Sequence, residues 1–530
     1  MRGVRRSAAD NEAVDAVAQA RPEAGPSAWV RASRDRAEAF VALAAFAVLC
    51  VLVLSVASRL VEPDDYAYRA SIVAITQGHF LTLSTAQMDR LAAQLPGPDG
   101  GPVAGGPAVI PQWVQLSDGR WISEKDPGYP FLAAPFQAAG IIRLAPLFYG
   151  ALGCLGLFFG ARRWLGRYGG SAAVALFCSS GAALLFAWRD YMPTFTDASL
   201  IAAGTGALLW TVLAAEATAR RRTSAGLAGF AALEAAVFVR YTDIVVLGFA
   251  VVAVVAAWRL RAVPAAALRW WLGSVAVSGA GVALFDDLVY GGPLTSGYRP
   301  GEITFSLSAV LPNLRYMPAH LIQAMPMLVP GLAALAWIAA RRVRLRRADQ
   351  ERAAPARRDL AVGLALAASW LSVWGLYAAY TWTAHPFGST LQVARFYVPA
   401  VGAISLLGSW LVTRLPRRAS LAAVTSAAVA AAMFGLGAWS FAVIRQSPFM
   451  GVHVRPPGVP QQAPHSSAQP RRAAFTACRV SAVTGSGGCS TGPVSSTAPG
   501  SASALSPFPQ LRPLAGLGGV PLLRLADHCP

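Results

Sequence analysis

Carboxylates are concentrated in the stretch VEPDDYAYRA, which directly follows an uncharged apolar run. Pro63 suits the first position of a helix, and Asp64 and Asp65 suit the positive N-terminal end behind it. Asp65 lies four residues before Arg69, the spacing at which opposite charges pair along a helix. We therefore expect a short surface helix in which Asp64 is the free carboxylate. The alternative is that Asp64 only caps the helix.

The single lysine of the chain, Lys125, lies in a second polar stretch, WISEKDPGYPFLAAPF. At a water–lipid boundary an ammonium group is suited to bind phosphate. Glu124 and Tyr129 lie beside it in sequence and are candidates for substrate contact. The alternative is an interfacial cation whose side chain extends to lipid headgroups.

Two more polar residues fall at the ends of apolar runs. Arg240, in FVRYTD, lies in a short turn and is a second candidate for phosphate binding, or an interface anchor beside Tyr241. Asp197, in RDYMPTFTDASL, opens the next apolar run after a polar turn.

These residues are set in a hydrophobic chain of 530 residues, 55% hydrophobic and 13% charged. About 20 apolar residues span a bilayer core. Because open sheets cannot cross lipid, the apolar runs predict an all-α polytopic membrane protein with about 11 transmembrane helices. The runs are Ala39–Ser58, Leu144–Ala161, Gly169–Trp188, Ala198–Ala215, Ser224–Val239, Ile244–Trp258, Trp270–Phe285, Leu321–Ala340, Leu360–Thr383, Phe396–Thr413 and Ala419–Ile444.

Basic clusters set the predicted orientation. ARRWLGR, ARRRT, WRLR, RRVRLRR and RLPRR all fall on one side of the predicted spans, which makes that side and the N-terminus cytoplasmic. The net charge of +19 therefore reflects the membrane topology and attraction to anionic lipid. It does not indicate nucleic-acid binding.

The predicted organisation has three parts. Residues 1–38 form a disordered cytoplasmic N-terminus, residues 39–445 the transmembrane domain with a large first outer loop at 59–143, and residues 446–530 a disordered Pro/Ser/Gly-rich extracytoplasmic tail. Most acids outside the N-terminus fall in outer loops, and only Glu234 sits plainly inside an apolar run. This distribution favours a site at the outer surface over a path through the bilayer.

Taken in order, these motifs resemble the GT-C glycosyltransferases, polytopic enzymes that include protein O-mannosyltransferases and lipid A aminoarabinose transferases. DDYAYRASIVAITQG is similar to their D-E-x-x-Y pattern, with Asp64, Asp65 and Tyr68 in the places of the Asp, Glu and Tyr. EKDPGYPFLAAPF resembles their E-K-P-P or K-x-P-G-Y-P element, and RDYMPTFTDASL their second acidic outer turn. VYGGPLTSGY and ARFYVPAVG resemble outer-loop stretches of bacterial members, so the resemblance covers about residues 40–445.

The resemblance implies an inverting glycosyl transfer, such as that of a mannosyltransferase, from a polyprenyl-phosphate sugar to a cell-envelope acceptor. Asp64 would be the catalytic base, and Asp65 or Asp197 would orient the acceptor or the base. Lys125 and Arg240 would stabilise the leaving phosphate. Tyr68, Glu124 and Tyr129 would contact the substrate. The expected location is the plasma (inner) membrane, with the active site extracytoplasmic.

The chain departs from the family in two places. Aminoarabinose transferases have an arginine before the motif tyrosine, where this chain has Ala67, so the phosphate role of that position is lost unless Arg69 substitutes. The Glu-x-Asp at Glu124–Asp126 in the first loop has a central lysine, which argues against a metal. A divalent cation is thus possible but not supported by the sequence, and no cofactor is certain.

Two other classes remain open. A lipid or glycan translocase predicts more charge in mid-helix and helices broken at corresponding places in two halves, of which MPMLVPGL at 325–332 is one candidate. A non-catalytic membrane protein of the cell envelope predicts that Asp64 and Lys125 do not matter individually.

Overall fold

The structure, a computed structural model, describes residues 28–58, 60, 62–95, 110, 112–116, 118–293, 295–298, 303–345, 350–384, 394–414, 428, 431–439 and 441–442. The predicted tail at 446–530 and most of the predicted N-terminal segment lie outside these residues. The helices are α2 (Ala28–Leu54), α3 (Pro63–Thr76), α4 (Thr85–Gln94), α5 (Gly128–Ala138), α6 (Ala145–Leu165), α7 (Gly169–Cys178), α8 (Gly181–Trp188), α9 (Thr194–Leu213), α10 (Ala219–Val239), α11 (Ile244–Arg259), α12 (Ala265–Tyr290), α13 (Val310–Ala324), α14 (Leu328–Leu345), α15 (Gln350–Ala378) and α17 (Val401–Arg414). Short 3-10 helices are η1 (Ile142–Leu144), η2 (Tyr241–Asp243), η3 (Leu307–Ala309), η4 (Trp382–Ala384) and η5 (Val398–Ala400), and the strands are β1 (Thr82–Leu83), β2 (Trp113–Gln115) and β3 (Trp121–Ser123).

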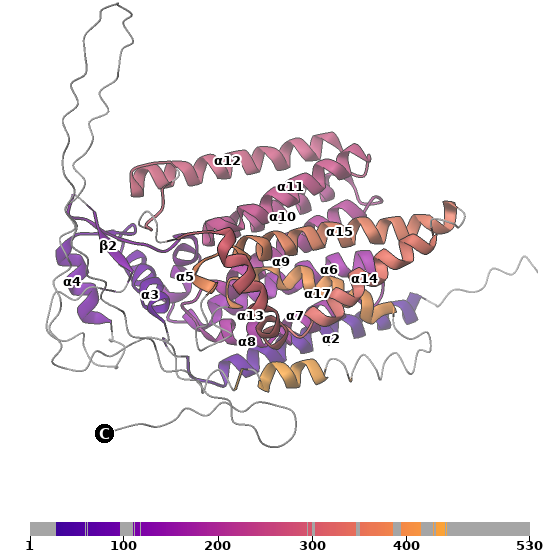
Figure 1. Cartoon of the computed structure of the whole chain (residues 1–530), viewed down its shortest axis with the longest axis horizontal. Helices are drawn as coiled ribbons and strands as arrows, with labels where there is room; N and C mark the ends of the chain where they lie inside the picture. The colour runs from indigo at the N-terminus through magenta and orange to yellow at the C-terminus, as the bar shows by residue number, and fades with distance from the viewer. Residues whose placement is uncertain are drawn as a thin grey trace, which may run out of the picture. The chain divides into compact units, whose positions relative to one another are not determined.

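Long apolar helices dominate the fold (Figure 1). The described residues contain seven helices long and apolar enough to cross a membrane, or nine spans if each of two bent pairs counts as one. This confirms the predicted polytopic helical class. The tenth predicted run corresponds to the shorter helix α17, and the eleventh is described only in part. The count of eleven and the cytoplasmic N-terminus stay predictions.

The two bends have local causes. Helices α7 and α8 meet at 60°, where the hydroxyl of Ser180 accepts the backbone N–H of Ala183 and caps α8. Helices α13 and α14 meet at 106°. Pro326 lies between them and has no N–H with which to continue α13.

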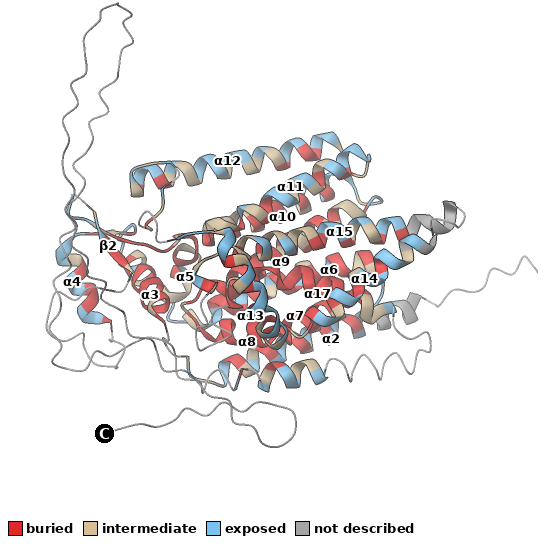
Figure 2. Ribbon diagram, in the orientation of Figure 1, coloured by how far each residue is buried: buried red, intermediate tan, exposed pale blue. Residues whose placement is uncertain are grey.

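Small residues on α6 and α9 allow the backbones of these two helices to approach closely. A Cβ at Gly156 would lie 2.6 Å from the Cα of Ala203, and one at Gly160 would lie 2.6 Å from the carbonyl oxygen of Gly206. Small residues let helix backbones approach, which is how helices associate in lipid. These two helices therefore form a tightly packed pair within the buried core (Figure 2).

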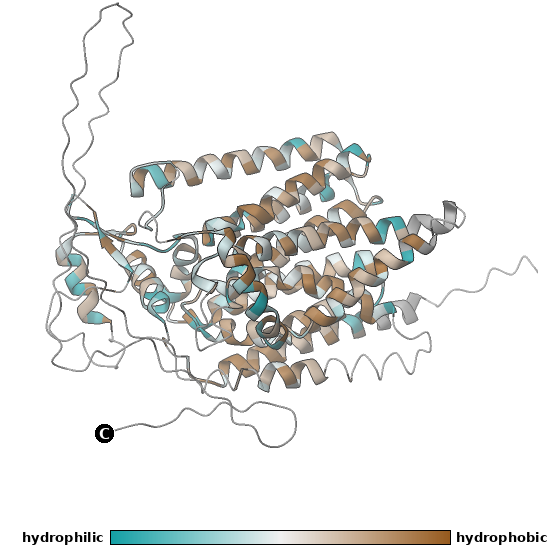
Figure 3. Cartoon of the chain, in the orientation of Figure 1, coloured by the Kyte–Doolittle hydropathy of each residue, from teal (hydrophilic) through white to brown (hydrophobic). Residues whose placement is uncertain are grey.

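Helix α12 is much more exposed than α6 and α9. Only 11% of its apolar window is buried, and apolar residues lie along it (Figure 3). Ser274 and Ser278 donate hydrogen bonds of 3.0 and 2.7 Å to the carboxylate of Glu234 on α10. These bonds attach α12 to the body of the protein and satisfy the acid inside its apolar run.

Helix α3 begins at Pro63 as predicted, and its first turn is closed by a capping box. The backbone N–H of Glu62 donates to Asp65, 3.0 Å away. The expected surface location is wrong, because nine of its fourteen residues are buried. It packs on α5, on α4 and on an antiparallel sheet of order β1-β3-β2, in which Trp113 pairs with Ser123. Burial of its first turn places the acids inside the protein.

Candidate functional site: a buried acid–base cluster

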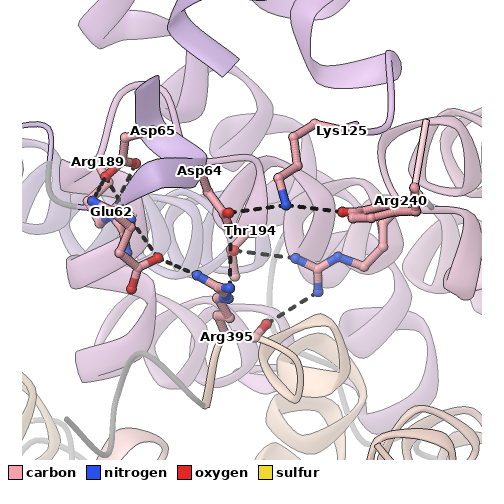
Figure 4. Close-up of polar contacts among 9 residues, drawn as sticks. Glu62, Asp64, Asp65, Lys125, Arg189, Thr194, Arg240 and Arg395 are labelled. Atoms are coloured by element: carbon pink, nitrogen blue, oxygen red, sulfur yellow. Dashed lines mark hydrogen bonds and ion pairs between the residues drawn. The ribbon is translucent and has the colours of Figure 1, made fainter. Parts of the chain in front are cut away.

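Four separate segments, that of α3 included, meet at the first turn of α3 (Figure 4). They bring together three carboxylates and three cations, which we call the acid–base cluster: Glu62, Asp64, Asp65, Lys125, Arg189 and Arg395. Lys125 follows β3, Arg189 follows α8, and Arg395 precedes η5. All six are less than 10% exposed. The cluster is therefore buried and balanced in charge.

Asp64 is held between two cations. The Nζ of Lys125 lies 3.1 Å from its Oδ1, and the Nη2 of Arg395 lies 3.0 Å from its Oδ2. The side-chain amide of Gln112 adds a hydrogen bond. The expectation that Asp64 is a free carboxylate is therefore wrong. Its partners come from segments far away in sequence, which helical spacing cannot reveal.

These contacts set the ionisation of the central pair. Burial favours the neutral acid, but Arg395 and Lys125 outweigh it and hold the pKa of Asp64 well below its usual range. Burial also opposes the charge of Lys125, yet Asp64 raises the pKa of the ammonium group above its usual value. Both groups are therefore ionised at neutral pH.

Asp65 has a structural partner. Arg189 donates from Nη2 to Asp65 at 2.7 Å and from Nε at 3.3 Å, and also from Nη2 to Glu62 at 3.0 Å. The predicted pairing of Asp65 with Arg69 is thus replaced by a buried bidentate one. The guanidinium of Arg69 instead lies 5.6 Å from the ring centre of Tyr191.

Close backbone packing fixes the turn that carries Lys125. A Cβ at Gly128 would lie 2.3 Å from the carbonyl carbon of Phe238, at the end of α10. On the other side, a Cβ at Gly297 would lie 2.3 Å from the carbonyl oxygen of Ser123. The next residue, Tyr298, accepts a hydrogen bond of 3.2 Å from the Nζ of Lys125. Because both glycines press on backbone, Lys125 is directed at Asp64.

A second group of charges adjoins the cluster, and we call it the Arg240 group: Arg240, Asp126, Asp197 and Asp243. The Nε of Arg240 lies 3.6 Å from Oδ2 of Asp197. Its Nη1 donates to the carbonyl of Arg395 at 3.3 Å, and its Nη2 to the hydroxyl of Thr194 at 3.4 Å. The predicted residues Asp197 and Arg240 are thus brought together beside Lys125.

The predicted substrate-contacting residues lie near this site and are buried. Tyr68 and Tyr129 pack edge to face with ring centres 6.0 Å apart. The hydroxyl of Tyr129 donates to the backbone carbonyl of Asp190. Glu124 is 7% exposed. Substrate contact by these side chains stays a prediction, as does a phosphate role for Arg69.

Sequence reasoning gave no role to Arg395 or Arg189. Both lie in motifs singled out in the sequence: Arg189 opens RDYMPTFTDASL, and Arg395 is the second residue of ARFYVPAVG. The available signal was an arginine next to the end of an apolar run, in a stretch that resembles one of the GT-C glycosyltransferases. Tyr298, at the end of VYGGPLTSGY, carried the same kind of signal.

The fold and the cluster together define a polytopic helical membrane protein with a buried polar site at one end of its spans. No family model and no curated protein sequence matches the chain. It is similar to the solved structure of ArnT from Cupriavidus metallidurans in the apo state, with 16% identity, a TM-score of 0.44, and coverage of 75% of this chain and 64% of that one. For ArnT bound to undecaprenyl phosphate the identity is 18%, the TM-score 0.42, and the coverage 77% and 64%.

It is also similar to an oligosaccharyltransferase from Archaeoglobus fulgidus, with 11% identity, a TM-score of 0.43, and coverage of 76% of this chain and 56% of that one. The chain thus spans less than two thirds of the length of each of these proteins. ArnT and this oligosaccharyltransferase are members of the GT-C superfamily.

Proposed function

We propose that this chain is a membrane glycosyltransferase that moves a sugar from a polyprenyl phosphate to an acceptor hydroxyl at the outer face of the plasma (inner) membrane. The observation that carries the proposal is the placement of Asp64 between Lys125 and Arg395, at 3.1 and 3.0 Å. A carboxylate beside two buried cations offers one proton acceptor and two phosphate ligands within a few ångströms. An acceptor hydroxyl and a phosphate-linked sugar need these groups.

The reaction is a single displacement with inversion. The acceptor's hydroxyl oxygen attacks the anomeric carbon of the sugar, while Asp64 takes the proton of that hydroxyl. The bond from that carbon to the phosphate oxygen breaks, and its electron pair leaves with the polyprenyl phosphate. Lys125, Arg395 and Arg240 stabilise the charge that develops on this phosphate.

Donor binding and base strength are coupled in this arrangement. Arg395 and Lys125 lower the pKa of Asp64 against the effect of burial. A phosphate that draws these cations away from Asp64 leaves burial as the larger influence, and burial raises the pKa of a carboxyl group. Asp64 then becomes a stronger base only when the donor is in place.

The test compares the wild type with Asp64→Asn in lipid nanodiscs. Each protein receives radiolabelled polyprenyl-phosphate-mannose or -arabinose and a cell-envelope extract as the source of acceptor. We expect the wild type to consume one donor and Asp64→Asn to lose about 10²–10⁴-fold in rate, the usual contribution of a general base. Asp118→Asn is the matched control, because Asp118 is an exposed acid of the same outer loop, paired with Arg120.

Two results contradict the proposal. Equal rates in the wild type and Asp64→Asn make Asp64 a structural ion-pair partner only. If no donor is consumed but labelled lipid crosses the bilayer of a proteoliposome, the chain is a translocase.

A further inference from the structure

The Arg240 group has an excess of acid. One guanidinium lies among three carboxyl groups, whereas the neighbouring acid–base cluster pairs three carboxylates with three cations. Asp197 is 0% exposed and Asp243 is 2% exposed. A buried pair of unneutralised negative charges is too costly to persist, so protons must be bound in this group.

The carboxyl groups of Asp197 and Asp243 lie close enough to hydrogen-bond to each other. An ionised carboxylate only accepts hydrogen bonds, so a bond between two carboxyl groups requires a proton on one of them. Within the described part of the chain, no N–H or O–H group donates to any of their four oxygens. If one of the two carboxyl groups is protonated, its O–H supplies the hydrogen-bond donor that the other needs.

We propose that Asp197 and Asp243 share one proton and that the resulting pair, with a single negative charge, positions Arg240. One negative charge 3.6 Å from the Nε neutralises the guanidinium. Its other nitrogens then remain bonded to Thr194 and to the carbonyl of Arg395, beside the cluster. Asp197 and Asp243 are positioning residues, and only their effect on transfer rests on the proposed function of Arg240.

The surroundings keep the proton on the pair. The charged and titratable groups that face it are Arg240, Asp126 from the turn after β3, and Tyr377 from α15. The hydroxyl of Tyr377 is engaged with that of Thr242, 2.7 Å away. Burial raises the pKa of Asp126 to about 7 although Arg240 and Lys125 oppose it, so this neighbour is itself partly protonated at neutral pH. Arg240 is thus the cation that balances the pair.

The first experiment measures the proton itself. Infrared spectra of the purified protein in nanodiscs record the carbonyl stretch of protonated carboxyl groups in Asp197→Asn, Asp243→Asn and the double variant. We expect each single variant to lose the same part of this band, and the double variant to lose no more than a single one. Asp287→Asn, at an exposed acid of α12, is the control and leaves the band unchanged.

An unchanged band in both single variants, or a loss twice as large in the double variant, overturns the shared proton. This readout needs no transfer activity. It therefore remains decisive if the chain proves not to be a glycosyltransferase.

The second experiment measures positioning through donor consumption. Asparagine in place of Asp243 can still donate a hydrogen bond to Asp197, whereas alanine cannot. We expect Asp243→Ala to lose about 10²-fold in kcat/KM, the cost of a displaced binding group, and Asp243→Asn to recover at least tenfold of that loss. Equal losses in the two variants, at equal thermal stability, overturn the positioning role.

Discussion

The Nζ of Lys125 lies 3.1 Å from the Oδ1 of Asp64, so the only lysine of the chain and the first acid of α3 form a buried ion pair. The pair joins the two polar stretches that the sequence offered as separate candidates. Each residue compensates the charge of the other. Removing Lys125 leaves Asp64 without this cation, and removing Asp64 leaves Lys125 without its carboxylate.

Substituting the lysine tests its role toward the donor phosphate. We expect Lys125→Met to lower kcat by about 10²–10³-fold, the usual cost of removing one group that stabilises developing charge. Steady-state donor consumption in nanodiscs measures this loss. A change in KM alone contradicts stabilisation of the leaving group.

Arg189 is expected to matter for stability, because it is 1% exposed and bonds to both Asp65 and Glu62. Replacing it with methionine leaves two buried carboxylates with one cation fewer, so we expect a loss of about 3–5 kcal/mol in the free energy of unfolding. Arg120→Met breaks an exposed pair with Asp118 and should leave the free energy of unfolding nearly unchanged, because water screens this pair. Denaturant unfolding in detergent distinguishes the two; similar losses would mean that the Arg189 pairs are not buried.

The turn that carries Lys125 tolerates no side chain at Gly128. The Cβ of Gly128→Ala would lie 2.3–2.4 Å from backbone atoms of Phe238 and Val239, which cannot rotate away. We expect a loss of about 1–3 kcal/mol, typical of overpacking, together with weaker donor consumption. Gly248→Ala is the control, because a Cβ there meets nothing within 4 Å. Equal melting temperatures for both variants contradict the close approach of the turn to α10.

Asp126 gives stability a pH dependence whose sign follows from its raised pKa. Its pKa rises from 3.8 to about 7 on folding, so the folded state binds the proton more tightly. The contribution of Asp126 to the free energy of unfolding is therefore greatest below pH 3.8. It falls as the pH rises and is lost above about 7. We expect Asp126→Asn to remove this decline. Melting temperatures at pH 5 and pH 8 measure it, and equal slopes in both proteins contradict the assignment.

Much of the fold could be predicted from local pattern. Helical spans and the start of α3 at Pro63 depend on neighbouring residues and on the bilayer. The partners of Asp64 and Asp65 could not be predicted in this way. A pair at i+4 contributes about 0.2–0.5 kcal/mol, and a buried bidentate arginine from a distant segment easily replaces it.

The shared proton of Asp197 and Asp243 was equally hidden. Both acids lie at ends of apolar runs, where a sequence predicts contact with water. Their burial arises from the packing of α9, α10 and η5, which no local pattern records.

The last cation to reach the cluster is Arg395, which lies 333 residues after its partner Glu62. Chains are made from the N-terminus at about 5–20 residues per second. Arg395 is therefore synthesised on the order of tens of seconds after Glu62 and Asp64. Lys125 and Arg189 arrive earlier, but until Arg395 is synthesised the first turn of α3 carries one uncompensated acid. Assembly of the site is thus among the late events in the biosynthesis of this protein.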